Sequence, residues 1–91
     1  MKIIASPQFL KKVKKLSKQG RKTVDGQIKR ILKNPKLGKE KKQDLKGVFV
    51  HKFKLNKQET LLSYKFAEDT LFLLTVGSHE NYYRDLKKYL H

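Results

Sequence analysis

The stretch that decides the fold is residues 48–77, which read VFVHKFKLNKQETLLSYKFAEDTLFLLTVG. Polar and apolar side chains alternate along this stretch, and β-branched, aromatic and leucine residues dominate it. Such a period of two is typical of β-strands. The polar segments 56–59 and 68–69 have the length and composition of hairpin turns. We therefore expect three consecutive antiparallel strands, at residues 48–55, 60–67 and 70–77.

Strand alternation also assigns the side chains to the two faces of this sheet. In the first strand, Lys52 and Lys54 share one face, and the same rule gives Lys65 of the second strand to that face. We expect the three lysines to form an exposed cationic surface. The opposite, core-forming face is expected to carry Phe49, His51, Phe53, Leu55, Leu62, Tyr64 and Phe66.

Two amphipathic helical patterns precede the strands. The first begins at Ser6-Pro7, a favourable N-cap followed by proline, and we expect it to end at Gly20. The second is expected to end at Asn34-Pro35. The apolar positions of the two patterns are Phe9, Leu10, Val13 and Leu16, then Val24, Ile28, Ile31 and Leu32.

The remaining segments complete an element order of β-α-α-β-β-β-α. Ile3-Ile4 predicts a short first strand, Lys33–Gly47 a surface loop, and His79–Leu90 a terminal helix. This order predicts an α+β fold in one domain over residues 1–91, an antiparallel sheet with an N-terminal helical hairpin packed on one face. The other face is expected to stay partly open.

The charge balance indicates a negatively charged partner. The chain has 91 residues and a formal net charge of +15, and 20 of its 23 cationic residues are lysines. Residues 1–46 hold 16 lysines and arginines against 3 acids, whereas residues 47–91 hold 7 against 5. Lysine favours attraction to phosphate over bidentate reading of bases. We expect Lys11, Lys15 and Lys18 of the helical half to hold nucleic acid.

Other classes of protein lack support in the sequence. There is no cysteine, so disulfides, thiolate metal sites and cysteine nucleophiles are excluded. No apolar stretch has the length of a signal peptide or a membrane span. We expect a cytoplasmic protein that does not enter a membrane.

The sequence offers one set of residues suited to phosphodiester chemistry. His79 follows the third strand, Tyr82 and Tyr83 come within one turn of it, and Arg84 adds a cation. RNA is cleaved when its 2′-hydroxyl attacks the adjacent phosphorus, which requires a base, an acid and cations. His79 would move a proton, the strand lysines would stabilise charge, and one tyrosine would stack on a base. This chemistry needs no cofactor and no metal.

The same residues permit plainer interpretations. His79 suits a helix cap or a surface position, Tyr82 and Tyr83 suit packing, and paired lysines can protect a sheet against aggregation. On this interpretation the chain is a basic RNA-binding module without catalysis. Motifs of glycosidases, phosphate-binding loops, zinc proteases and serine hydrolases do not occur.

Taken together, several short motifs resemble the RelE/ParE superfamily of toxins from bacterial type II toxin–antitoxin modules. They are Leu45-Lys46-Gly47, His51–Leu55, Leu61–Tyr64 and Leu73–Tyr83. The resemblance spans nearly the whole chain and implies the element order given above. It also implies an antitoxin that wraps the toxin. Because the chain is strongly cationic, we expect the tail of that antitoxin to carry acidic and apolar residues.

The resemblance further implies an activity and its residues. RelE-like members cut messenger RNA on the ribosome without a metal, using dispersed basic residues and an aromatic one. Lys52 and Lys54 match the lysines of the strand motif, while His79 and Tyr83 match the Gly-x-His ending of YafQ-like members. These four are the expected catalytic residues, with Lys65, Arg84, Tyr82, Lys11, Lys15 and Lys18 as RNA-binding residues.

One departure from the RelE pattern bears on the mechanism. Leu61 stands where the pattern has an arginine, and His79 coincides with a second family arginine. Either His79 shifts the mechanism toward a histidine-based variant, or Lys65 or Arg84 compensates. Several ParE-like relatives inhibit DNA gyrase instead, and a shared fold does not separate the two activities.

Overall fold

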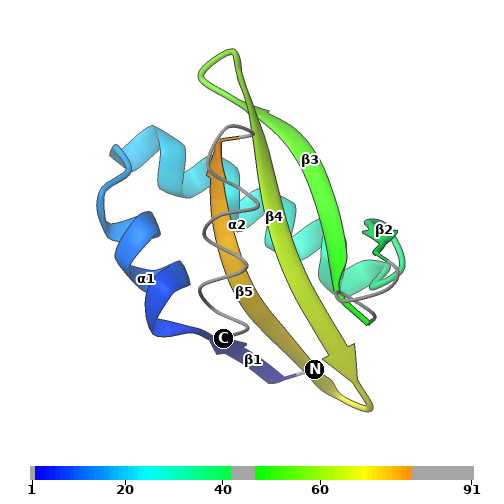
Figure 1. The fold of residues 1–91 in the computed structure, drawn as a ribbon. Coiled ribbons are helices and arrows are strands. Elements are labelled where there is room, and N and C mark those ends of the chain that lie inside the picture. The colour runs from blue at the N-terminus through cyan, green and yellow to red at the C-terminus, as the bar shows by residue number, and fades with distance from the viewer. Residues whose placement is uncertain (1, 42–46, 79–91) are drawn as a thin grey trace.

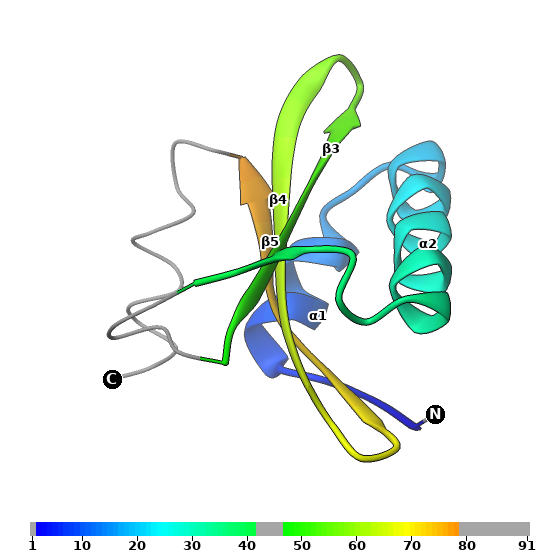
Figure 2. The same cartoon turned by 90° about the vertical axis from the view of Figure 1, so that its right-hand side faces the viewer.

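The computed structural model describes residues 2–41 and 47–78 as a mixed sheet with two helices on one face (Figure 1, Figure 2). The α+β class, the helical hairpin and the antiparallel meander are confirmed. The sheet order among these residues is β1-β5-β4-β3-β2. The elements are β1 (Lys2–Ala5), α1 (Pro7–Lys14), α2 (Lys18–Lys33), β2 (Lys39–Glu40), β3 (Phe49–Leu55), β4 (Gln58–Ala67) and β5 (Thr70–Ser78).

The sheet departs from the prediction at both edges. β1 pairs in parallel with β5, so the sheet is mixed and not purely antiparallel. The segment expected to be only a loop contributes β2, which pairs with β3 through Lys39–Val50 and Glu40–Phe49. Two residues are too few to leave a periodic signal, so only the neighbouring strand reveals them. The predicted helix at residues 79–90 lies outside the described residues.

The helix boundaries follow from two serine caps. The Ser6 hydroxyl accepts a hydrogen bond from the amide of Phe9 at 3.0 Å, as expected for the start of α1. The predicted end at Gly20 is wrong, because α1 ends at Lys14 and Ser17 caps a new helix by accepting from the Gly20 amide at 3.1 Å. Gly20 is therefore buried in the first turn of α2. The predicted end of α2 at Asn34 is confirmed.

The core lies between the helices and the sheet face that they cover, here called the helix face. Its buried members come from α1, α2 and the three long strands, and Tyr64 and Leu62 are completely buried. Leu10, expected in this core, is instead 55% exposed. The buried core set is Phe9, Val24, Ile31, Phe53, Leu62, Tyr64, Leu71, Leu73 and Val76.

A β-bulge joins the sheet to the first helix. The pairing of β4 with β5 shifts between Ser63 and Tyr64, so that Leu74 is the extra residue between Leu73 and Thr75. The Leu74 carbonyl accepts a hydrogen bond of 2.6 Å from the Ser6 hydroxyl, and the Leu73 carbonyl accepts one of 2.9 Å from the Ser6 amide. One serine thus caps α1 and fixes its start against β5.

Tyr64 connects β4 to the segment that follows α2. Its hydroxyl donates to the Pro35 carbonyl at 2.7 Å and accepts from the Gly38 amide at 2.9 Å. Burial raises the pKa of this hydroxyl, and the Gly38 hydrogen bond partly offsets the rise. A Cβ at Gly38 would lie 2.9 Å from both the Tyr64 hydroxyl and the Val50 carbonyl, so only glycine permits this approach.

No helix in the described part of the chain is long and apolar enough to cross a membrane.

The turn between β3 and β4 yields a stability prediction. Leu55 pairs with Gln58, so the loop has two residues, Asn56 and Lys57, with φ of 51° and 69°. Positive φ at both positions is the type I′ geometry, in which asparagine followed by glycine is preferred. We expect Lys57→Gly to raise the free energy of unfolding by about 0.5–1 kcal/mol, because lysine is strained at positive φ. Urea unfolding measures the change.

The matched control is Lys57→Ala, which removes the same charge and retains the Cβ. We expect no comparable gain from it. An equal gain in both variants would mean that lost charge repulsion, and not backbone strain, is responsible.

The Tyr64 hydroxyl yields a second prediction. Tyr64→Phe removes both hydrogen bonds and leaves the Pro35 carbonyl and the Gly38 amide without this partner. We expect a loss of about 1–3 kcal/mol in unfolding free energy, with the ring packing retained. Equilibrium denaturation gives the loss, and near-ultraviolet circular dichroism verifies the packing. Unchanged stability would show that water satisfies these groups equally well.

Candidate functional site

Two exposed lysines stand on the sheet face opposite the helices, here called the outer face. Lys52 and Lys54 alternate along β3 with the buried His51 and Phe53. Both lysines are solvent-exposed, as the sequence predicted. Their Cα atoms are two residues apart on one strand, about 7 Å. Together they form a pair of ammonium groups on one surface, which we call the lysine shelf.

Lys65 is on the outer face but far from the shelf. It pairs with Phe72, whereas Lys52 pairs with Leu61, four residues earlier along β4. Four residues of strand span about 13 Å. Lys65 is also half-buried, while both shelf lysines are exposed. The predicted surface of three lysines is therefore a close pair with one distant member.

An acidic side chain next to the shelf escaped the sequence analysis. The sequence predicts a hairpin turn over residues 56–59, but β4 begins at Gln58, so Glu59 lies in the strand and pairs with Lys54. Its Oε1 lies 3.9 Å from the Nζ of Lys52. The Lys52 side chain is 66% exposed and that of Glu59 48% exposed. A predicted hairpin with Leu55 opposite Gln58 would have placed Glu59 opposite Lys54.

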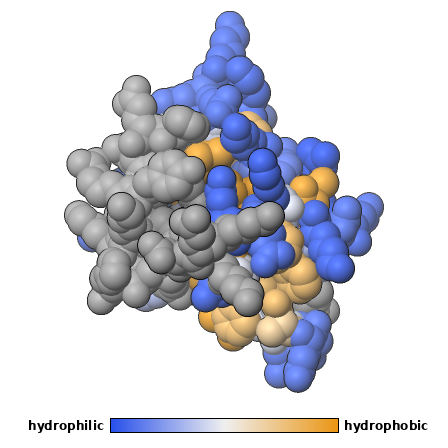
Figure 3. All heavy atoms as spheres, turned by 45° about the vertical axis from the view of Figure 1, so that its right-hand side comes forward, coloured by the Kyte–Doolittle hydropathy of each residue, from blue (hydrophilic) through white to orange (hydrophobic). Residues whose placement is uncertain are grey.

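The middle of the outer face is less open than predicted. Val48, Val50, Leu61 and Leu74 form a second buried cluster there, with Phe72 packed against it. Leu61, the position where the RelE pattern has an arginine, is only 3% exposed. Figure 3 views this face obliquely and shows hydrophilic side chains beside hydrophobic ones. An apolar side chain thus suits the surroundings of position 61.

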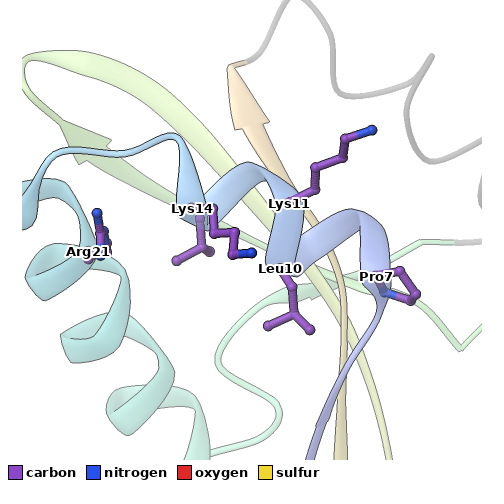
Figure 4. A pocket seen from close by; sticks show the side chains of 6 residues that line it. Pro7, Leu10, Lys11, Lys14 and Arg21 are labelled. Atoms are coloured by element: carbon purple, nitrogen blue, oxygen red, sulfur yellow. The ribbon is translucent and has the colours of Figure 1, made fainter.

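The helical lysines lie on the other side of the sheet from the shelf (Figure 2). Lys11, Lys15 and Lys18 are all exposed, in or just after α1 and at the start of α2. An open hollow of about 500 Å³ lies between the two helices, and of these three lysines Lys11 lines it (Figure 4). It is lined by Pro7, Leu10, Lys11, Val13, Lys14 and Arg21. The two-helix segment and the shelf thus lie on opposite sides of the sheet.

The remaining predicted site residues, His79, Tyr82, Tyr83 and Arg84, lie outside the described residues. The strand that precedes them, β5, ends level with the shelf, with β4 between it and β3. Gly77 of β5 pairs with Leu61, which in turn pairs with Lys52. Among residues 2–41 and 47–78, no group of three His, Asp or Glu side chains is arranged to hold a metal ion.

His51 is a structural residue on the helix face. Its Nε2 lies 2.6 Å from the Oε1 of Gln27 on α2, and its ring stacks on Phe53 with centroids 5.8 Å apart. The amide oxygen can only accept, so Nε2 carries the proton and donates. Burial, and secondarily the Arg30 guanidinium, lower the pKa of His51. His51 is thus a neutral contact between β3 and α2.

Comparisons with known proteins agree with this architecture. The family model of ParE-like toxins of type II bacterial toxin–antitoxin systems matches residues 3–87. The E. coli RelBE toxin–antitoxin complex has a chain with a TM-score of 0.68 and 20% identity, covering 85% of this chain and 94% of that one. A search of curated proteins found no match.

Two further solved structures show the same fold. A free E. coli RelE with two arginines changed to alanine has a TM-score of 0.71 and 18% identity, covering 96% of this chain and 95% of that one. The YoeB/ParE toxin from Agrobacterium tumefaciens has a TM-score of 0.70 and 15% identity, covering 87% and 99%. The chain belongs to the ParE-like toxins of type II toxin–antitoxin systems.

The lowered pKa of His51 predicts a pH-dependent stability. Its folded value lies below the ordinary 6.5, so on acidification the unfolded chain binds a proton more readily than the folded protein. The effect of His51 leaves the unfolding free energy at its full value above pH 6.5. The unfolding free energy then declines as the pH falls toward the lowered pKa of folded His51. Urea unfolding at neutral and mildly acidic pH should therefore show lower stability in acid.

The matched variant is His51→Gln, which keeps a polar side chain but has no ionisable group at this position. Its difference in stability between the two pH values should be smaller than that of the unaltered chain. An equal difference would assign the acid sensitivity to other groups.

Proposed function

We propose that residues 1–91 form one toxin domain that cleaves translated messenger RNA on the ribosome without a metal. The observation that carries the proposal is the lysine shelf, two exposed ammonium groups on β3, which is separated by β4 alone from β5, the strand that leads into His79. An ammonium group offers three donors and no acceptor, which suits the non-bridging oxygens of a phosphodiester. Resemblance to RelE-like toxins supports the same assignment.

The proposed reaction is attack of the RNA 2′-oxygen on the adjacent phosphorus. A base removes the 2′-hydroxyl proton, the new O2′–P bond forms and the P–O5′ bond breaks. An acid protonates the departing 5′-oxygen, leaving a 2′,3′-cyclic phosphate and a 5′-hydroxyl. Negative charge grows on the phosphorane oxygens, and fixed cations nearby stabilise it.

Each predicted residue has a role in this proposal. Lys52 and Lys54 stabilise the phosphorane, His79 moves a proton and Tyr83 stacks on or orients the substrate. Tyr82 and Arg84 support RNA binding near His79. Lys65 contacts the RNA backbone further along β4. Because Leu61 is buried among apolar residues, the charge stabilisation falls on the lysines and His79.

The presence of exposed lysines on both sides of the sheet supports a ribosomal partner. The exposed Lys11, Lys15 and Lys18 belong to the two-helix segment, which lies on the opposite side of the sheet from the shelf (Figure 2). A partner that contacts both sides must surround the protein, as the RNA walls of a ribosomal site would. The helical lysines would then hold ribosomal RNA while the shelf meets the message.

An antitoxin is the second proposed partner. The similar E. coli RelE was solved in a complex with its antitoxin and, in another structure, with an antitoxin peptide. A segment with acidic and apolar side chains would neutralise the shelf and cover the outer face around it. We expect purification in good yield to require such a partner. The proposed activity on translated messages also implies that the protein acts in the cytoplasm, where translation occurs.

Gyrase inhibition is the alternative function, supported by the match to the ParE-like family model. It predicts supercoiling defects and a DNA-damage response with intact messenger RNA. A non-catalytic RNA-binding module is the third, and it predicts no growth arrest that depends on His79.

The test is brief induction followed by primer-extension mapping of translated messages. The unaltered chain should produce cuts within reading frames. His79→Ala should abolish them, and the double change Lys52→Ala/Lys54→Ala should reduce cleavage by about 100-fold or more, since lost electrostatic stabilisation costs that much at comparable sites.

The matched control is Lys29→Ala, which removes one exposed lysine from α2, away from the shelf. It should leave cleavage unchanged. Full cleavage by the His79→Ala variant would remove this histidine from the mechanism, and intact messages with relaxed plasmids would favour gyrase inhibition.

A further inference from the structure

Glu59 is the acidic residue that the structure brings to the lysine shelf. Its Oε1 is 3.9 Å from the Nζ of Lys52, and its backbone pairs with that of Lys54. A residue directly across an antiparallel pair has its Cβ about 4.5–5.5 Å from that of its partner, so one carboxylate is within reach of both lysines. The outer face therefore has its own anion next to the cations proposed to bind phosphate.

This ion pair is weak and easily exchanged. Both side chains are largely exposed, at 66% and 48%, and exposed pairs of this kind contribute little to stability. The ion pair between Glu59 and Lys52 therefore contributes little to the free energy of unfolding. A phosphate oxygen that approaches Lys52 must compete with Glu59 for the same ammonium group and also meets the repulsion of its charge.

We propose that Glu59 is an intramolecular counter-anion of the lysine shelf, displaced when an RNA phosphate binds, and that it limits RNA affinity at this surface. The identification of the ligand of the shelf as an RNA backbone rests on the proposed function. Glu59 acts through Lys52 and Lys54, so it is a positioning residue. It keeps the shelf partly neutral until a polyanion arrives that offers several phosphates at once.

The chain provides a matched pair on the other side of the sheet. Asp25 and Lys29 on α2 form an exposed ion pair of 3.4 Å, with side chains 65% and 73% exposed. Asp25→Asn and Glu59→Gln each remove one carboxylate from an exposed lysine pair and raise the net charge by one. Any effect of overall charge is therefore common to both variants, and an effect of position belongs to Glu59 alone.

The experiment measures binding of a single-stranded RNA whose 2′-hydroxyls are methylated, so that it binds without being cleaved. Fluorescence anisotropy at low salt should show about two- to fivefold tighter binding for Glu59→Gln, the range expected for loss of one exposed competing charge. Asp25→Asn should change affinity less. The gain should shrink at high salt, which screens exposed charges.

A double-mutant comparison tests whether Glu59 acts through Lys52. In the Lys52→Gln background, Glu59→Gln should give a smaller gain than in the unaltered chain. A purely structural role of Glu59 would change the unfolding free energy without tightening RNA binding. Urea unfolding of each variant separates that effect from binding.

Equal affinities of Glu59→Gln and Asp25→Asn would overturn the inference and leave the proposed nuclease activity standing, since cleavage is measured separately on unmodified messages. A gain confined to Glu59→Gln in a protein that cuts no message would support the inference as a property of RNA binding and would refute the nuclease. If Glu59→Gln raised RNA affinity as much in the Lys52→Gln background as in the unaltered chain, the inference that Glu59 acts through Lys52 would be overturned.

Discussion

The buried hydroxyl of Tyr64 is the constraint on which the arrangement of the sheet and the second helix depends. It holds the Pro35 carbonyl and the Gly38 amide, the two ends of the segment that leaves α2. The same segment lies against Val50 at Gly38 and then forms β2 at the edge of the sheet. A polar group in a dry core must find partners, so the tyrosine fixes where the helix ends relative to β3, the strand that carries the shelf.

A second buried polar connection orients the first helix. Ser6 caps α1 and also binds the carbonyls of Leu73 and Leu74, which the β-bulge of β5 presents on neighbouring positions. Both helices are thus tied to the sheet by a few directed hydrogen bonds within a largely apolar interface. Apolar packing alone is non-directional, whereas these bonds specify one docking of the helices and keep them on one face.

The division of the sheet into two faces separates stability from the proposed chemistry. The helix face takes the large core side chains and the neutral His51, whereas the outer face carries the shelf and Glu59. The family model of ParE-like toxins, which matches residues 3–87, establishes the toxin family, and a fold alone does not fix a target. The exposed ammonium groups of Lys52 and Lys54 on the outer face suit the phosphate contact that we propose.

The sequence by itself determined the three long strands, the two faces of β3, the cap at Ser6 and the end of α2, because each depends on local periodicity or local hydrogen bonding. Only the tertiary structure decided the parallel pairing of β1, the two-residue β2, the burial of Leu61 and the position of Glu59 beside Lys52. It also separated Lys65 from the shelf. These features depend on register between distant segments, and no pattern within one segment encodes which residue of another strand lies opposite.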